Sequence, residues 1–412
     1  MNKTLGTVLL VSGTMIGAGM LAMPLTSAGI GFAFTVVLLV ALWLLLTYSA
    51  LLFVEVYQTT DSDAGIGTLS AIYYGNAGRI ISTGVMFVFL YALLSAYITG
   101  GGGILMQAAQ DIGLLSGNLG EGEAKQMHRI FIAAFTLFFG IFVIISTSVL
   151  DGFNRLLFFI MLLALAAVIL IMLARVKMEN LMAMPLDNAL LISASPIFFT
   201  SFGFHGSIPS LNKYLEGNVR ALRFAIITGS VITLVGYIFW QLSTHGVLTQ
   251  SQFTEILSKN PTLNGLIDAS RQITGSNVIA TAVQVFSALA LVTSFLGVSL
   301  GLFDCIEDML AKGMNIKAGR MLLGVLTFLP PVLFAYFYPD FIAALSYAGQ
   351  MFAFFAVILP VGLVWKARRR YPDLPYRVAG GDIALIIALV LGVTVACIPF
   401  LIKAGWLPQV VG

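Results

Sequence analysis

Long stretches without Asp, Glu, Lys or Arg dominate this chain, and the first runs for 51 residues, from Thr4 to Val54. A helix that crosses a bilayer needs about 20 apolar residues, whereas a transmembrane β-strand needs only about 10. The length of these runs therefore predicts membrane-spanning helices. The runs cover residues 4–54, 80–110, 130–150, 156–174, 188–212, 224–254, 272–303, 321–339, 341–365 and 383–402.

The first run is long enough for two helices, and Gly29 and Gly31 mark the expected turn between them. We therefore predict an all-α membrane protein with eleven transmembrane helices. Composition agrees with this prediction, because 59% of the residues are hydrophobic and only 9% are charged. Soluble domains carry about 25% charged residues, so a water-soluble fold is excluded.

The distribution of basic residues predicts the orientation of the chain. If the N-terminus is cytoplasmic, 14 of the 21 Lys and Arg residues fall on inner segments, including "KARRR" at 366–370. Inner loops of membrane proteins carry this excess, and an odd number of helices then places the C-terminus in the periplasm. The net charge of +3 gives no indication of a nucleic-acid partner, and no feature indicates an obligatory protein partner.

Two helices contain the same kind of interruption. Helix one carries "GTMIGAGMLAMP" at 13–24, and helix six, five helices later, carries "TSFGFHGSIPS" at 200–210. Each combines mid-span glycines and small hydroxyl residues with a closing proline. Matching Gly/Pro interruptions in two halves of a chain indicate the binding site of a secondary transporter. Small residues also allow close helix packing, and this remains the alternative interpretation.

Unwound backbone in a membrane must find polar partners, because each unpaired group costs several kcal/mol. Amides at the start of a half-helix suit a carboxylate, while carbonyls at the other broken end suit an ammonium group or a small cation. A zwitterionic amino acid matches both ends. A channel is less favoured because no stripe of polar or charged residues follows a helix. An enzyme or metal site is also less favoured, because the spans lack the clusters of His, Asp and Glu that such a site needs.

Several longer motifs resemble the hydroxy and aromatic amino acid permeases of bacteria. They are "GTMIGAGMLAMPL", "ALLFVEVY", "FTSFGFHGSIPS", "TSFLGVSLGLFD" and "TFLPPVLFAYFYP", and the resemblance extends over essentially the whole chain. It implies a LeuT-like fold of two five-helix inverted repeats. These repeats would comprise residues 1–175 and 188–370, and a peripheral eleventh helix would lie within 381–406.

The resemblance also implies an activity. It implies a proton-driven importer of L-tyrosine in the bacterial inner membrane that works by alternating access and needs no cofactor. Tryptophan or phenylalanine as the main substrate, and Na⁺ as the coupling ion, remain open. Carried over to this chain, the expected substrate-binding residues lie in the two breaks and in helix three; they are Thr14, Gly17, Ala18, Gly19, Tyr97, Ser201, Phe202, Gly203, Phe204 and His205.

His205 is the leading candidate for coupling. An ionisable group inside a span suggests function by default, and imidazole titrates near neutral pH. His205 would relay the proton or hydrogen-bond the substrate hydroxyl. Alternatively, it is a neutral side chain that satisfies backbone groups exposed by the break.

Four further residues are candidates for ion coupling. Thr293 and Ser294 on helix eight match the pair that holds Na⁺ in sodium-coupled relatives, although such hydroxyls also bond back to their own helix. Glu55 and Asp304 lie near the cytoplasmic ends of helices two and eight. They would accept a proton or, as the favoured interpretation, pair with inner Lys and Arg residues and help to close the cytoplasmic gate.

Overall fold

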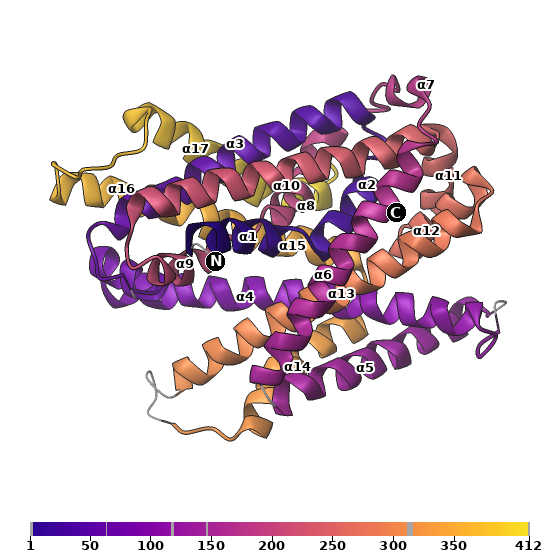
Figure 1. The fold of residues 1–412 in the computed structure, drawn as a ribbon, viewed down its shortest axis with the longest axis horizontal. Coiled ribbons are helices and arrows are strands. Elements are labelled where there is room, and N and C mark those ends of the chain that lie inside the picture. Colours follow the sequence, from indigo (N-terminus) through magenta and orange to yellow (C-terminus); the bar gives the residue numbers. More distant parts are fainter. Residues whose placement is uncertain (1–2, 63, 117–118, 146, 311–315, 411–412) are drawn as a thin grey trace.

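The computed structural model describes residues 3–410, except 63, 117–118, 146 and 311–315, and it forms a bundle of helices (Figure 1). The first half contains α1 (Lys3–Met15), η1 (Ala18–Leu21), α2 (Ala22–Ser27), α3 (Phe32–Tyr57), α4 (Ile66–Asp111), α5 (Glu121–Ile145), α6 (Thr147–Leu173) and α7 (Met178–Leu181). The second half contains α8 (Ala189–Ser201), η2 (His205–Ser207), α9 (Ile208–Tyr214), α10 (Val219–Val247), α11 (Gln250–Lys259), α12 (Leu263–Thr274), α13 (Asn277–Asp308), α14 (Arg320–Phe337), α15 (Phe341–Ala353), η4 (Phe354–Ile358), α16 (Leu359–Arg370) and α17 (Gly381–Lys403).

The predicted helix count is confirmed for the part of the chain that the structure describes. Ten helices there are long and apolar enough to cross a membrane, and the pair Lys3–Met15 and Ala18–Ser27, bent by 43°, makes eleven. The predicted turn after the first span is also present, with Gly31 at a φ of +83°. A Cβ on Gly31 would collide with the carbonyl oxygen of Ala183, so this tight turn requires glycine.

Two segments differ from the pattern of charge-free runs. Helix α4 begins at Ile66, well before the run at residue 80, and a non-helical Gly75 marks a kink within it. The polar segment between α10 and α13 folds into α11 and α12. The absence of charge identifies only the part of a helix in lipid. A helix can continue beyond that part, as α4 does, and a polar segment can form separate amphipathic helices, as α11 and α12 do.

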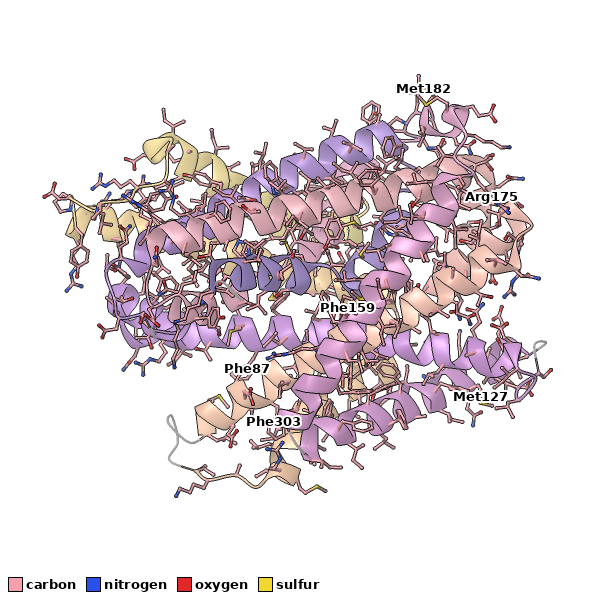
Figure 2. All side chains as sticks on the ribbon, in the orientation of Figure 1. Phe87, Met127, Phe159, Arg175, Met182 and Phe303 are labelled. Atoms are coloured by element: carbon pink, nitrogen blue, oxygen red, sulfur yellow. The ribbon has the colours of Figure 1, made fainter. Side chains whose placement is uncertain are left out.

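The outer surface of the bundle carries large apolar side chains. Figure 2 shows them around the ribbon, including Phe159 on α6, which is 60% exposed, and Met182 beside α7, which is 73% exposed. Exposed apolar surface on this scale indicates contact with a membrane rather than water. The functional groups therefore belong inside the bundle.

The two interrupted helices lie in the middle of the bundle. In Figure 1, α1 is drawn between α10 on one side and α4 on the other. Helix α1 packs along α10, and α8 packs against α15 and α3. Lys3, at the start of α1, pairs with Glu216 just after α9, the last part of helix six. The start of helix one and the end of helix six therefore meet at one end of the bundle.

Candidate substrate site between the two helix breaks

Helix α13 contacts the break in helix one. Helix α1 ends at Met15, and η1 begins at Ala18. The Ala18 N–H donates a hydrogen bond of 2.9 Å to the Ser294 hydroxyl oxygen. A Cβ on Gly17 would overlap that same oxygen. The glycine therefore allows α13 to approach the unwound backbone.

The break in helix six lies directly beside the first one. Helix α8 ends at Ser201, and residues 202–204 separate it from η2. A Cβ on Gly19 would lie only 3.2 Å from both the Cα and the Oγ of Ser201. The two interrupted segments, which share one pattern in the sequence, therefore also lie next to each other in the structure.

Helix α10 contacts both breaks with aromatic side chains that bear polar tips. The Tyr237 hydroxyl oxygen lies 2.7 Å from the Met15 carbonyl oxygen and 2.6 Å from that of Ser201. The Trp240 indole N–H donates to the Met20 carbonyl at 3.1 Å. Sequence reasoning missed both residues. Their spacing of three places them on one helical face, but ordinary packing aromatics show the same signal.

A cavity of about 560 Å³ reaches both breaks. This volume is in the range of small-molecule sites. The predicted residues that line it are Thr14, Gly17, Ala18, Gly19, Tyr97, Ser201, Gly203, Phe204, Thr293 and Ser294. Residues not foreseen from the sequence include Phe89, Asn154, Arg155, Phe158, Phe352 and Phe355.

The remaining predicted residues do not line this cavity. Phe202 is buried, with its ring centroid 5.1 Å from that of Tyr237. His205 is fully buried, and the rings of Phe204 and Phe352 pack on it at centroid distances of 4.9 and 5.3 Å. Because these two phenylalanines belong to the cavity lining, the imidazole lies behind the cavity wall.

The hydrogen bonds of His205 define its tautomer. Its Nε2 lies 3.1 Å from the Leu46 carbonyl oxygen and 2.9 Å from the Ser49 hydroxyl. A carbonyl only accepts, so a proton on Nε2 satisfies this contact. The Nδ1 atom is buried and has no hydrogen-bond partner among the described residues. The ring therefore contacts the backbone of the intact helix α3 rather than groups that a break exposes, and with the proton on Nε2 its Nδ1 keeps one unused acceptor.

The two hydroxyls on α13 have different partners. Ser294 accepts from the break in helix one, whereas Thr293 donates to the Leu289 carbonyl in its own helix at 2.9 Å. Asp304, further along α13, is exposed and does not line the cavity. Ser294 is thus the candidate on α13 whose hydroxyl bonds to helix one.

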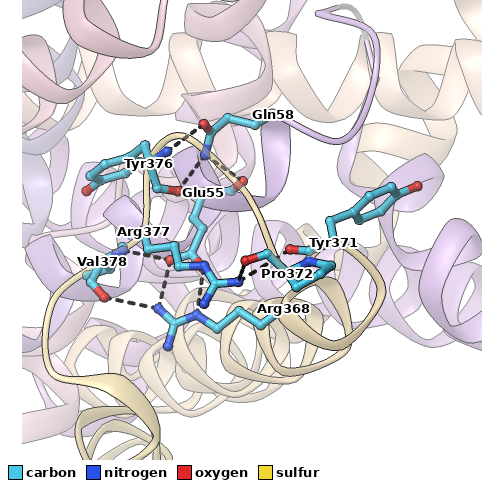
Figure 3. A network of polar contacts seen from close by, with 8 residues as sticks. All are labelled: Glu55, Gln58, Arg368, Tyr371, Pro372, Tyr376, Arg377 and Val378. Atoms are coloured by element: carbon cyan, nitrogen blue, oxygen red, sulfur yellow. Dashed lines mark hydrogen bonds and ion pairs between the residues drawn. The ribbon is translucent and has the colours of Figure 1, made fainter.

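Glu55 forms an ion pair with a basic residue, Arg368 (Figure 3). Arg368 on α16 donates to both carboxylate oxygens, through Nε at 2.6 Å and through the NH2 nitrogen at 2.8 Å. The Val378 N–H adds a third bond of 2.7 Å. Gln58, one turn after Glu55, donates to the Tyr376 carbonyl at 2.8 Å. This network ties the end of α3 to α16 and the following loop.

A second cavity, of about 1060 Å³, lies toward the opposite end of the bundle, beside α12 and the end of α17. The first cavity extends to Leu9 in the middle of α1 and to Cys305 near the end of α13. On α4, Tyr97 lines the first cavity and Gly100 the second. These residues are one helical turn apart, or about 4.5 Å. The barrier between the cavities is therefore thin.

The side chains that separate the two cavities are apolar around Gly100. A Cβ placed on this glycine would lie 3.1–3.3 Å from side-chain atoms of Leu263, Leu291 and Phe341, which belong to α12, α13 and α15. Paired helix breaks between cavities directed to opposite ends of an apolar bundle define a secondary transporter.

Comparison with known proteins assigns the chain to a family. Residues 1–399 match the tryptophan/tyrosine permease family, and the chain belongs to it. It is 62% identical to tyrosine-specific transport system 1 of Haemophilus influenzae over 413 residues, covering 100% of both chains. It is 52% identical to tyrosine-specific transport system 2 of the same organism, covering 100% of this chain and 99% of the relative.

A solved structure shows the same fold. Mhp1, a nucleobase-cation-symport-1 family transporter, matches with a TM-score of 0.60 at 16% identity, covering 98% of this chain and 93% of that one. The predicted family and LeuT-like fold are therefore confirmed. The chain is a multi-pass membrane transporter and not an enzyme.

Proposed function

We propose that this transporter imports L-tyrosine across the bacterial inner membrane by proton symport and alternating access. The observation that carries the proposal is the cavity that joins both helix breaks to a group of aromatic side chains. The two Haemophilus relatives, both named as tyrosine-specific, support tyrosine over tryptophan or phenylalanine.

The backbone of the breaks suits the amino acid head group. Gly17 is the residue before η1 and Gly19 is the second residue of η1, where the partial positive charge of a helix start attracts a carboxylate to their amides. Met15 and Ser201 end their half-helices, and the carbonyl lone pairs there that the Tyr237 hydroxyl does not occupy attract an ammonium group. The proposed substrate is therefore held by backbone groups of helices one and six.

Aromatic residues suit the substrate side chain. The rings of Phe89 and Phe352 are stacked with centroids 5.1 Å apart, and both line the cavity together with Tyr97, Phe204 and Phe355. Aromatic pairs add about 0.5–1.5 kcal/mol to the energy of burial. These rings would favour an aromatic amino acid over an aliphatic one of similar size.

Alternating access requires the barrier between the cavities to move from one side of the substrate to the other. With the N-terminus in the cytoplasm and the C-terminus in the periplasm, the cavity of about 560 Å³ extends toward the cytoplasm. The apolar contacts around Gly100 then form the closed periplasmic gate. The pair of Glu55 and Arg368 is formed while this cavity extends toward the cytoplasm, so in this proposal it ties the ends of α3 and α16 together and does not by itself close the cytoplasmic side.

We favour H⁺ as the coupling ion, with His205 as its candidate carrier. The unused Nδ1 of this residue could accept a proton behind two rings of the cavity wall. Na⁺ is the alternative, with Thr293 and Ser294 as ligands. In this conformation their hydroxyls bond to Leu289 and to the Ala18 N–H, which supports H⁺. We assign Glu55 to the ion pair with Arg368, and we propose no organic cofactor.

Uptake of labelled tyrosine into proteoliposomes tests the proposal. A pH gradient and a Na⁺ gradient are imposed separately, with protein-free liposomes as the control. We expect tyrosine to accumulate when the outside is acidic, without any need for Na⁺. Uptake driven only by Na⁺ would overturn the proton assignment. Failure of tyrosine to enter or compete, while tryptophan or phenylalanine does, would overturn the substrate assignment.

A further inference from the structure

One phenol joins the two broken helices. Tyr237 is fully buried on α10, and its hydroxyl oxygen lies within 2.7 Å of two carbonyl oxygens, those of Met15 and Ser201. These carbonyls belong to the last residues of α1 and α8. At such positions the helix itself runs out of amide donors, so a partner from another element is needed.

The arrangement has an electrostatic consequence. The carbonyl end of a helix carries a partial negative charge of about half an electron, and here two such ends converge on one point. A tyrosine hydroxyl has one proton to donate. It therefore bonds to one carbonyl at a time, while its oxygen stays within contact of the other. The proton lies between two groups that would otherwise repel each other.

The face of α10 that carries Tyr237 also contacts helix one beyond its break. Trp240 donates to the Met20 carbonyl within η1, and the Gln241 side-chain oxygen accepts a bond of 3.1 Å from Ser27 at the end of α2. Residues 237, 240 and 241 recur at helical spacing. Helix α10 is unbroken over Val219–Val247, so it provides a continuous surface against which the interrupted helix is aligned.

We propose that Tyr237 is a positioning residue that sets the two helix breaks in register, because its hydroxyl proton bridges the carbonyl ends of α1 and α8. The inference rests on the substrate site proposed above. The phenol does not line the cavity, so it acts through the backbone of the breaks. Its loss should let the two half-helix ends separate and should weaken substrate binding and transport without preventing folding.

Two replacements at position 237 test this role. Tyr237→Phe removes the donor and keeps the ring. Tyr237→p-aminophenylalanine supplies two N–H donors, one for each carbonyl. Tyr91→Phe is the matched control, because the Tyr91 hydroxyl also donates to a backbone carbonyl, that of Leu326 at 2.8 Å, but joins α4 to α14 outside both breaks.

Initial uptake rates give kcat and KM separately, and melting temperatures report stability. We expect Tyr237→Phe to raise KM and to lower kcat/KM at least tenfold. The p-aminophenylalanine variant should keep kcat/KM within threefold of the wild-type value, and Tyr91→Phe should keep it within twofold. Both Phe variants should lose similar stability. A structural role alone would lower stability without this difference in kcat/KM.

Equal kcat/KM for the two Phe variants would overturn the inference, as would a p-aminophenylalanine variant with less than a tenth of the wild-type value. If Tyr237→Phe fails to reach the membrane, the kcat/KM of the p-aminophenylalanine variant alone tests the inference, with a tenth of the wild-type value as the limit. The ratios are taken with whichever aromatic amino acid the wild-type protein carries. A wrong substrate assignment therefore changes the assay solute and leaves the comparison at Tyr237 intact.

Discussion

The ion pair between Glu55 and Arg368 offers a direct test of how the ends of α3 and α16 are held together. The Glu55 side chain is 0% exposed and that of Arg368 is 12% exposed. Three hydrogen bonds end on the carboxylate, two from Arg368 and one from the Val378 N–H. Glu55→Gln keeps the size of the side chain but removes its charge. It also turns an amide NH₂ toward groups that only donate.

The expected cost follows from burial. Breaking a buried ion pair by removing one partner costs about 3–5 kcal/mol, because the other charge stays buried without compensation. An unfolding entropy of about 2.1 cal/mol/K per residue corresponds to roughly 0.9 kcal/mol/K for 412 residues. We therefore expect the melting temperature to fall by about 3–6 °C.

Thermal unfolding in detergent, with purified wild type and variants side by side, measures this shift. Glu216→Gln is the matched control, since the pair between Lys3 and Glu216 is exposed, at 56% and 78%, and exposed pairs contribute little. The double variant Glu55→Leu/Arg368→Met should recover most of the loss, because apolar residues can replace a buried pair. Equal shifts for Glu55→Gln and Glu216→Gln would refute the reasoning.

Three further predictions concern the cavity, coupling and the segment between α10 and α13. Gly17→Ala should lower kcat/KM for uptake at least tenfold, because its Cβ displaces the Ser294 hydroxyl; Gly17→Ala/Ser294→Ala should restore part of it, and unchanged kinetics would contradict the close approach. His205→Ala should reduce proton-driven uptake while the protein stays folded; an unaltered dependence of kinetics on pH would assign the residue a structural role. Burial raises the pKa of Asp268 on α12 above its usual value of 3.8, so the folded state favours the neutral form, and wild-type stability should rise as the pH falls from 7 through that raised pKa. Asp268→Asn should lack this increase in melting temperature, and a parallel pH profile in the variant would rule out the assignment.

The sequence by itself determined the class of the protein and the place of its breaks. Runs without charge are long enough to identify spans such as Phe32–Tyr57, because the cost of placing charge in lipid acts on each residue locally. Glycine and proline weaken a helix locally as well. The two breaks, near Gly17 and Gly203, could therefore be predicted from the sequence although they lie five helices apart. The limits of α4 could not be predicted, because a helix that leaves the membrane no longer needs apolar residues.

Only the tertiary structure decided which side chains meet. Glu55 bonds to an arginine 313 residues away, and Tyr237 reaches the ends of two different helices. His205 lies in the predicted break and yet turns behind the cavity wall, next to Leu46 of another helix. The physical reason is that the rotation of a helix about its axis, and the partner it faces, depend on packing with every neighbour. Local sequence patterns do not contain that information.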